Sequence, residues 1–484
     1  MNYKLVLSVL GKVMITLAIL LLCPLCVGLI YREMDKIVAF AIPCLILIVL
    51  GIPLSLIRDK NKLFYAKEGF VIVSLSWIIV SLFGALPFTI SGEIPYYIDA
   101  FFETVSGFST TGASILDNVE VLSKSIQFWR VLTHFIGGMG VLVFVLAMLP
   151  EESGAMHIFR AESPGPSSSK FVSKIRHTAR ILYLIYIVLT FIEIIFMLCG
   201  GLSLYDSILV SFSTAGTGGF SNYSDSIAHF NSTYVEVVVA TFMLLFGVNF
   251  NVFYLILTGN VAKALKSEEF ISYILILTTS ILIIAINLLS QGIDFANGLR
   301  LAFFQTTSIS STTGYVTADF ISWPTLSKSI LLILTLIGAC GGSTGGGLKV
   351  SRFVILIKSA SAHLKRAVNP RSVVPVKFEG KPLAKQTESG VRTFLLLYIF
   401  LVILSTLLLS FDNILGDDAI LTNLSASLTC ISNVGPGMTN LIGPLGSFAV
   451  YSPLSKILLS FLMLVGRLEI FPMLLLFAPR TWKK

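Results

Sequence analysis

Long apolar runs recur along this sequence, and they constrain its fold more than any other feature does. Residues 5–30 and 38–57 each reach the roughly 20 residues that a helix needs to cross a bilayer. Hydrophobic residues make up 55% of the chain and charged residues only 12%, below the roughly 25% of charged residues in a soluble domain. The sequence therefore predicts an all-α polytopic membrane protein. The first run is too long for a signal peptide and has no small-residue cleavage site, which indicates a retained helix.

The distribution of charge predicts which loops lie on each side of the membrane. Basic residues crowd into residues 58–67, 160–180, 263–266, 349–392 and 480–484. The intervening loops contain acidic residues: Glu93, Asp99, Glu103, Asp117, Glu120, Asp206, Asp225, Asp319, Asp417 and Asp418. Because cytoplasmic loops carry an excess of Lys and Arg, we expect the basic stretches inside and the acidic loops outside. The net charge of +8 then reflects membrane topology, and we expect no nucleic-acid partner.

The chain repeats one pattern four times after its first two spans. Residues 1–62 contain the two N-terminal spans, and the predicted units are residues 63–165, 166–266, 267–375 and 376–484. Each unit has a long apolar segment, a short amphipathic segment, a polar loop and a second apolar segment. In the first, second and fourth units the second segment predicts spans over about residues 128–149, 235–261 and 454–477. Each loop contains a serine, two further residues and a glycine: Ser109 to Gly112, Ser213 to Gly216, Ser311 to Gly314 and Ser432 to Gly435. The regular spacing of these glycines is typical of an internal repeat.

The polar loops have the composition of an ion filter. Short segments of about ten residues cannot cross a bilayer and fit re-entrant helices. Polar backbone at membrane depth is tolerated where protein buries it or where it lines a wet cavity. Carbonyl oxygens in such a loop can replace the water shell of an ion, and Tyr315 after Gly314 strengthens the likeness to a potassium filter. One such loop could be an ordinary extracellular turn, but four in the same register favour a shared pore.

Two further features lie within predicted spans. Residues 338–349, with the sequence GACGGSTGGGLK, interrupt the second span of the third unit, because each Gly costs a helix roughly 1 kcal/mol relative to Ala. This stretch lacks the GK[ST] ending of a nucleotide-binding P-loop. Arg467 lies about thirteen residues, or roughly 20 Å, along the last span, where burying an arginine costs at least about 2.5 kcal/mol. It could face the pore, form a structural ion pair or extend toward the interface, and Glu469 is not its obvious partner.

These residues together resemble the Trk/Ktr/HKT potassium transporter superfamily, and most closely the bacterial Trk-system membrane subunits of the TrkH type. The resemblance covers the whole chain, including the two extra N-terminal helices. It implies four repeats of span, pore helix, filter and span around a central pore. It also implies that a glycine at the filter position of all four repeats goes with potassium selectivity.

The resemblance implies a set of site residues. The expected filter residues are Thr110, Thr111, Gly112, Thr214, Ala215, Gly216, Thr312, Thr313, Gly314, Asn433, Val434 and Gly435. The expected gate below the filter consists of Gly341, Gly342, Ser343, Thr344, Gly345, Gly346, Gly347 and Arg467. The second loop continues Thr217-Gly218-Gly219, so its register could shift to Gly218, and the fourth loop lacks the Thr pair.

The implied function is potassium uptake across the bacterial inner membrane through a channel-like pore. Potassium is the substrate and the only metal, bound at the filter, and we expect no cofactor in the chain. The expected partners are the lipid bilayer, a second copy in a homodimer and a cytosolic nucleotide-binding regulatory subunit (TrkA-like). Extracellular Asp99, Glu103, Asp117 and Asp319 could raise the local cation concentration.

Two other functions were considered. Obligate cotransport with protons or sodium would need an ionisable carrier, and Glu193 in the span 181–198 is the first candidate. Catalysis is disfavoured, because the five histidines are scattered singly and neither an HExxH motif nor a GxSxG nucleophile elbow occurs. The GGSTG of residues 341–345 belongs to the glycine-rich stretch that interrupts a predicted span. The pair Cys23 and Cys26 has no second pair or histidine partner, so we interpret it as packing.

Overall fold

The computed structural model describes residues 1–57, 66–140, 175–412 and 418–482. The described residues are almost entirely helical, and their strands are the two-residue β1 (Lys377–Phe378) and β2 (Lys381–Pro382), which pair antiparallel. Within these described ranges, six helical segments are long and apolar enough to cross a membrane: Tyr3–Ile30, Met34–Ser55, Lys67–Ile90, Arg180–Cys199, Glu268–Gln291 and Lys385–Leu409. These observations confirm the predicted all-α polytopic membrane fold.

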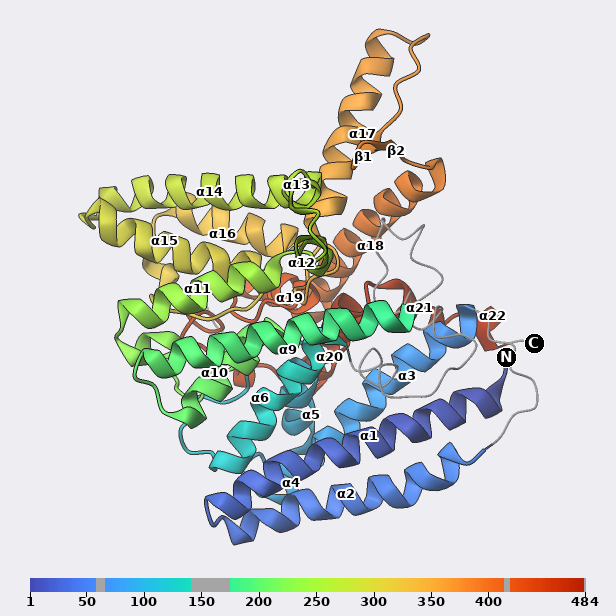
Figure 1. The fold of residues 1–484 in the computed structure, drawn as a ribbon, viewed down its shortest axis with the longest axis vertical. Coiled ribbons are helices and arrows are strands. Elements are labelled where there is room, and N and C mark those ends of the chain that lie inside the picture. The colour runs from blue at the N-terminus through green and yellow to red at the C-terminus, as the bar shows by residue number, and fades with distance from the viewer. Residues whose placement is uncertain (58–65, 141–174, 413–417, 483–484) are drawn as a thin grey trace.

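The two N-terminal spans form an antiparallel hairpin along one edge of the molecule (Figure 1). Helices α1 (Tyr3–Ile30) and α2 (Met34–Ser55) approach closely where Gly11 faces Gly51. A Cβ on Gly11 would lie 2.5 Å from the backbone nitrogen of Ser55 and 2.8 Å from Gly51 O. Small residues at a crossing let two membrane helices pack backbone to backbone, so these glycines fix how the hairpin closes.

Four units follow the hairpin, each with the predicted order of span, pore helix, loop and second helix. Their first helices are α3 (Ala66–Gly84, extended by α4, Leu86–Ile90), α9 (Ile175–Cys199), α14 (Glu268–Leu288, followed by η2, Leu289–Gln291) and α18 (Lys385–Leu409). Their pore helices are α5 (Tyr97–Phe108), α10 (Leu204–Gly216), α15 (Phe295–Ser310) and α19 (Ala419–Ser432). Short 3₁₀ turns after the loops are η1 (Ser226–Phe230), η3 (Phe320–Ser322) and η4 (Phe448–Val450).

The second helices of the second and fourth units are shorter than the apolar pattern predicts. The second helices of the four units are α6 (Lys124–Met139), α11 (Thr233–Gly247), α16 (Thr325–Ile337) and α20 (Pro453–Arg467). Continuous spans over residues 235–261 and 454–477 were expected, and these expectations are wrong. Helix α11 turns by 90° into α12 (Phe250–Leu257), and α20 stops before Ile470, which has a positive φ of 68°. The expected span 128–149 is helical to Met139, and its remainder lies outside the described residues beyond Gly140.

A helical arm projects from the body where the third unit meets the fourth (Figure 1). It consists of α17 (Val350–Val368), the β1–β2 turn and the start of α18. Short helices α13 (Val261–Leu265), α21 (Phe471–Leu476) and α22 (Pro479–Trp482) complete the described structure. Helix α1 begins beside the end of α22, where the Tyr3 hydroxyl donates a hydrogen bond to Trp482 O over 3.0 Å (Figure 1).

Parts of the predicted organisation fall outside the described residues. The boundaries at 62/63 and 165/166 do so, as do most of the basic stretches 58–67 and 160–180, together with His157 and Asp417. The boundaries at 266/267 and 375/376 remain predictions.

Candidate functional site

The four pore helices end in the same backbone structure. Each is followed by a residue in the left-handed region: Thr110 (φ 56°), Thr217 (φ 53°), Thr312 (φ 63°) and Asn433 (φ 56°). The next backbone N–H donates to the carbonyl five residues earlier: Thr111 to Ser106, Gly218 to Ser213, Thr313 to Ser308 and Val434 to Thr429, over 2.9–3.0 Å. This is a helix C-cap of the Schellman type, and it identifies structurally equivalent positions in the four units.

The shared cap corrects the register of the second loop. Thr214, Ala215 and Gly216 lie in the last turn of α10, and Gly216 occupies the place that Ser109 has in the first unit. The equivalents of Thr110, Thr111 and Gly112 are therefore residues 217–219, a shift that reaches Gly219 rather than Gly218. We name the four equivalent triplets loop 1 (110–112), loop 2 (217–219), loop 3 (312–314) and loop 4 (433–435).

The four loops close into a ring through their glycines. A Cβ on Gly112 would lie 1.9 Å from Gly218 O, one on Gly219 2.0 Å from Thr313 O, one on Gly314 2.1 Å from Val434 O, and one on Gly435 2.7 Å from Thr111 O. Each glycine thus touches a carbonyl of the next loop, and loop 4 returns to loop 1. The same glycines have positive φ angles of 77°, 80°, 81° and 104°. Residues with a Cβ atom rarely adopt such angles. Both constraints require glycine at these four places.

One pocket opens onto all four ring glycines. It is lined by Gly112, Gly219, Gly314 and Gly435 and also by Asp117. The pocket does not reach Gly216, in agreement with the corrected register. This pocket therefore provides an entrance to the ring.

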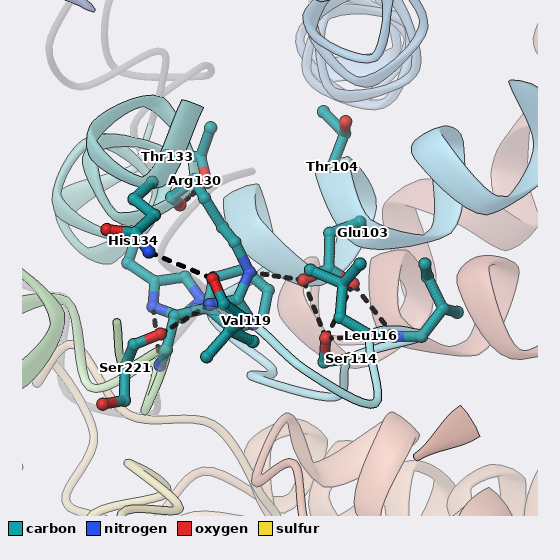
Figure 2. Close-up of polar contacts among 12 residues, drawn as sticks. Glu103, Thr104, Ser114, Leu116, Val119, Arg130, Thr133, His134 and Ser221 are labelled. Carbon is teal, nitrogen blue, oxygen red and sulfur yellow. Dashed lines mark hydrogen bonds and ion pairs between the residues drawn. The ribbon is translucent and has the colours of Figure 1, made fainter. Parts of the chain in front are cut away.

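Side chains fasten neighbouring loops to one another. Asn433 Nδ2 donates to Thr111 Oγ1 over 2.9 Å, joining loop 4 to loop 1. The buried Tyr315 hydroxyl donates to Phe220 O over 3.3 Å, joining the segments after loops 3 and 2. Arg130 on α6 reaches the segment after loop 2 through Ser221 O at 2.9 Å (Figure 2).

The glycine-rich stretch 338–349 forms a non-helical segment between α16 and α17, as predicted, and it packs under loops 3 and 4. Gly346 N donates to Thr312 Oγ1 over 2.7 Å. A Cβ on Gly345 would lie 2.6 Å from Ser311 O, and one on Gly346 2.2 Å from Ser432 O. The stretch therefore contacts the residues at which loops 3 and 4 begin, and it does not line the pocket.

Glu269 and Lys349 hold the rest of this segment. Glu269 Oε1 accepts from Gly341 N over 2.6 Å and from Ser351 N over 3.2 Å. The Lys349 ammonium donates to Gly345 O. Sequence reasoning missed Glu269, because its partners lie more than 70 residues further along the chain.

Arg467 joins the glycine-rich segment to the first unit. Its guanidinium donates to Thr344 O over 2.6 Å, to Gly138 O over 2.6 Å and to Gly137 O over 2.5 Å. These acceptors are backbone carbonyls. The helical spacing predicted that Glu469, two positions further on, is not the obvious partner of Arg467, and Glu469 forms an ion pair with Arg352.

Two of the four acidic residues expected to attract cations are neutralised by a basic partner. Glu103 is 1% exposed and pairs with Arg130 over 2.5 Å, and Asp99 pairs with Lys456 over 2.7 Å. Asp319 accepts from Ile321 N and caps η3. Asp117 is exposed and lines the pocket. Of these four residues, Asp117 is the one that lines the pocket.

The residues considered for other functions lie apart from the pocket. Glu193 is fully buried on α9, against Thr214 of α10. His134 is also fully buried, stacks on Phe220 and lies against Gly218 of loop 2. Cys23 and Cys26 lie unpaired and exposed on α1.

The fold and the ring define a class of protein: a multi-pass helical membrane protein with four pore-loop repeats. The family model described as "TrkH: Cation transport protein" matches residues 36–484. The Trk system potassium uptake protein TrkH of Salmonella typhimurium is 34% identical over the full length of both chains, and Escherichia coli TrkG is 32% identical over 96% of this chain and 95% of its own. The crystal structure of the potassium transporter TrkH from Vibrio parahaemolyticus covers both chains completely, with a TM-score of 0.89 at 30% identity. The chain therefore belongs to the TrkH family of cation transport proteins.

Proposed function

We propose that this chain takes up potassium across the cell membrane through the ring formed by loops 1 to 4. Two observations support the proposal. The full-length relatives are named as potassium uptake proteins, and four equivalent loops touch one another in a closed cycle at the floor of one pocket. The cycle is the observation that carries the proposal, because an ion can lose its water only where several oxygens surround it at once.

The proposed ion-binding residues follow the corrected register. They are Thr110, Thr111, Gly112, Thr217, Gly218, Gly219, Thr312, Thr313, Gly314, Asn433, Val434 and Gly435. Asp117 at the pocket raises the local cation concentration. Backbone carbonyls of the ring then replace the hydration shell of the potassium ion.

The proposed gate is the glycine-rich segment together with Arg467. The contacts of Gly345 and Gly346 with loops 3 and 4 support this role, because they put the segment directly against the ring. Arg467 holds the segment through Thr344 O and adds a fixed positive charge. Opening requires a partner that binds the open arrangement better than the closed one. We propose a cytosolic nucleotide-binding regulatory subunit for this role, a homodimer as the assembly and the bacterial inner membrane as the location.

A glycine substitution tests the proposal. Gly219→Ser would push its side chain against Thr313 O, whereas Gly292→Ser has the same kind of positive φ (77°) with nothing within 4 Å. The assay is rubidium uptake into vesicles that contain the purified protein, with unlabelled potassium or sodium as competitor. We expect Gly219→Ser to abolish uptake or its preference for potassium, and Gly292→Ser to preserve both. Equal behaviour of the two variants would overturn the assignment of loop 2 to the filter.

A further inference from the structure

A buried ion pair lies behind the first two loops, and the proposed function does not yet use it. Glu103 on α5 is 1% exposed, Arg130 on α6 is 4% exposed, and Arg130 Nε donates to Glu103 Oε1 over 2.5 Å. Glu103 also accepts from Ser114 Oγ at 3.0 and 3.1 Å and from Ile115 N at 3.0 Å. Figure 2 shows Glu103 between Ser114 and the guanidinium of Arg130.

The other three units have no charge at the corresponding positions. Glu103 lies seven residues before the left-handed residue of loop 1, where the other units have Val210, Gln305 and Ala426. Arg130 lies seven residues after the N-cap of α6, where the other second helices have Val239, Leu331 and Leu459. The fold of one unit is therefore compatible with apolar residues at both places.

Folding of the unit alone gives no reason for the charges. Replacing a buried ion pair by well-packed apolar residues is often neutral or stabilising, because both charges must lose their water. The second unit has this alternative, with Val210 and Val239 buried in one cluster. The first unit carries the costlier ion pair, and the charged groups of this pair also contact the segments that follow loops 1 and 2.

The ion pair spans the junction between loops 1 and 2. Glu103 binds Ser114 and Ile115, which follow Gly112 of loop 1. The guanidinium of Arg130 donates to Ser221 O over 2.9 Å and lies 3.6 Å from the ring centroid of Phe220, and these two residues follow Gly219 of loop 2. One rigid group thus holds the segments that leave two neighbouring ring glycines.

We propose that Glu103 and Arg130 are positioning residues for ion selectivity that fix the separation of loops 1 and 2. This inference rests on the proposed filter function. The planar guanidinium can bind a carboxylate, a carbonyl and an aromatic face at the same time, which a lysine cannot do. A fixed separation keeps the ring from contracting around the smaller sodium ion.

An apolar exchange tests the proposal without leaving a buried charge unpaired. The double variant Glu103→Val/Arg130→Val gives the first unit the valine pair of the second. The matched control is Glu236→Leu/Arg300→Leu, which removes the 3.2 Å ion pair between α11 and the outer end of α15, away from the loops. The assay is rubidium uptake into vesicles in the presence of unlabelled sodium or potassium as competitor. It measures, for each competitor, the concentration that halves the rate of rubidium uptake.

We expect the valine pair to lower the ratio of the half-inhibiting sodium concentration to the half-inhibiting potassium concentration at least about threefold. This change corresponds to a loss of roughly 0.6 kcal/mol in discrimination between the two ions. We expect the control to keep the wild-type ratio. A folded valine variant with the wild-type ratio would overturn the positioning role. A wild-type protein that fails to discriminate between the two ions would instead overturn the proposed function.

A second variant covers the case in which the valine pair does not fold. Arg130→Lys keeps the charge and an ammonium that can reach Glu103 but loses the simultaneous contacts with Ser221 O and Phe220. We expect Arg130→Lys to fold, to take up rubidium and to discriminate less than the wild type. Unchanged discrimination in this variant would contradict the proposal independently.

Discussion

Removing the Thr312 hydroxyl should open the proposed gate. Thr312 is fully buried, and its Oγ1 accepts the backbone N–H of Gly346 over 2.7 Å. Thr312→Val keeps the shape of the side chain and its β-branching but leaves that N–H without an acceptor while the segment lies under the ring. The cost falls on the closed arrangement, because the Gly346 N–H can bind water once the segment has moved away.

The size of the effect follows from the burial of this hydrogen bond. An unsatisfied buried donor costs about 1–3 kcal/mol. Since about 1.4 kcal/mol corresponds to a tenfold change in an equilibrium constant, the ratio of open to closed protein should rise by about 5- to 150-fold. Uptake by the membrane subunit alone should increase in proportion as long as the closed form predominates.

The assay is the initial rate of rubidium uptake into vesicles that contain purified protein without any regulatory partner. Thr110→Val is the matched control, because Thr110 is the equivalent residue of loop 1, is equally buried, and its hydroxyl has no hydrogen-bond partner among the described residues. Both variants place valine at a left-handed position, so they share any cost to the loop itself. Equal rates for the two variants would refute the gating role of the contact between Thr312 and Gly346.

Three further outcomes are expected. Gly11→Leu should lower the free energy of unfolding of the purified protein by about 1–3 kcal/mol, because the new Cβ would lie 2.5 Å from the backbone nitrogen of Ser55. Thermal melts should show no such loss for Gly28→Ala, whose Cβ would lie 3.5 Å from its nearest neighbour. Glu33→Gln should cost about 0.5–2 kcal/mol of stability, measured by denaturant melts, because the carboxylate caps the first turn of α6. Glu193→Gln should leave the pH dependence of uptake unchanged; a lost pH dependence would instead favour proton cotransport.

Local patterns were enough to predict the repeated fold. Apolar runs and the spacing of the loop glycines gave the order of span, pore helix, loop and span, because both are set by residues close together in sequence. The register of loop 2 was predicted wrongly because counting from a serine ignores where the helix ends. Gly216 is still helical, and the pattern Thr217-Gly218-Gly219, which parallels Thr110-Thr111-Gly112, was the signal that could have corrected it.

Partnerships across long sequence separations could not be predicted. The sequence shows the charge of Asp99 but not its ion pair with Lys456, 357 residues away. For the same reason, Glu103 was among the residues expected to raise the local cation concentration, although Arg130 neutralises it inside the protein. The break after Gly247, where α11 bends by 90° into α12, was also not predicted, because the apolar sequence pattern continues through the bend.

The cap that Glu33 forms on α6 has a consequence for how the chain is made. Its carboxylate accepts from Lys124 N over 2.8 Å, and the two residues are 91 positions apart. At roughly 5–20 residues per second, the ribosome needs about 5–18 s to supply Lys124 after Glu33 has emerged. During that interval the hairpin of α1 and α2 has to remain folded without the contacts of α6. The close packing of the two helices at Gly11 and Gly51 stabilises the hairpin until α6 is made.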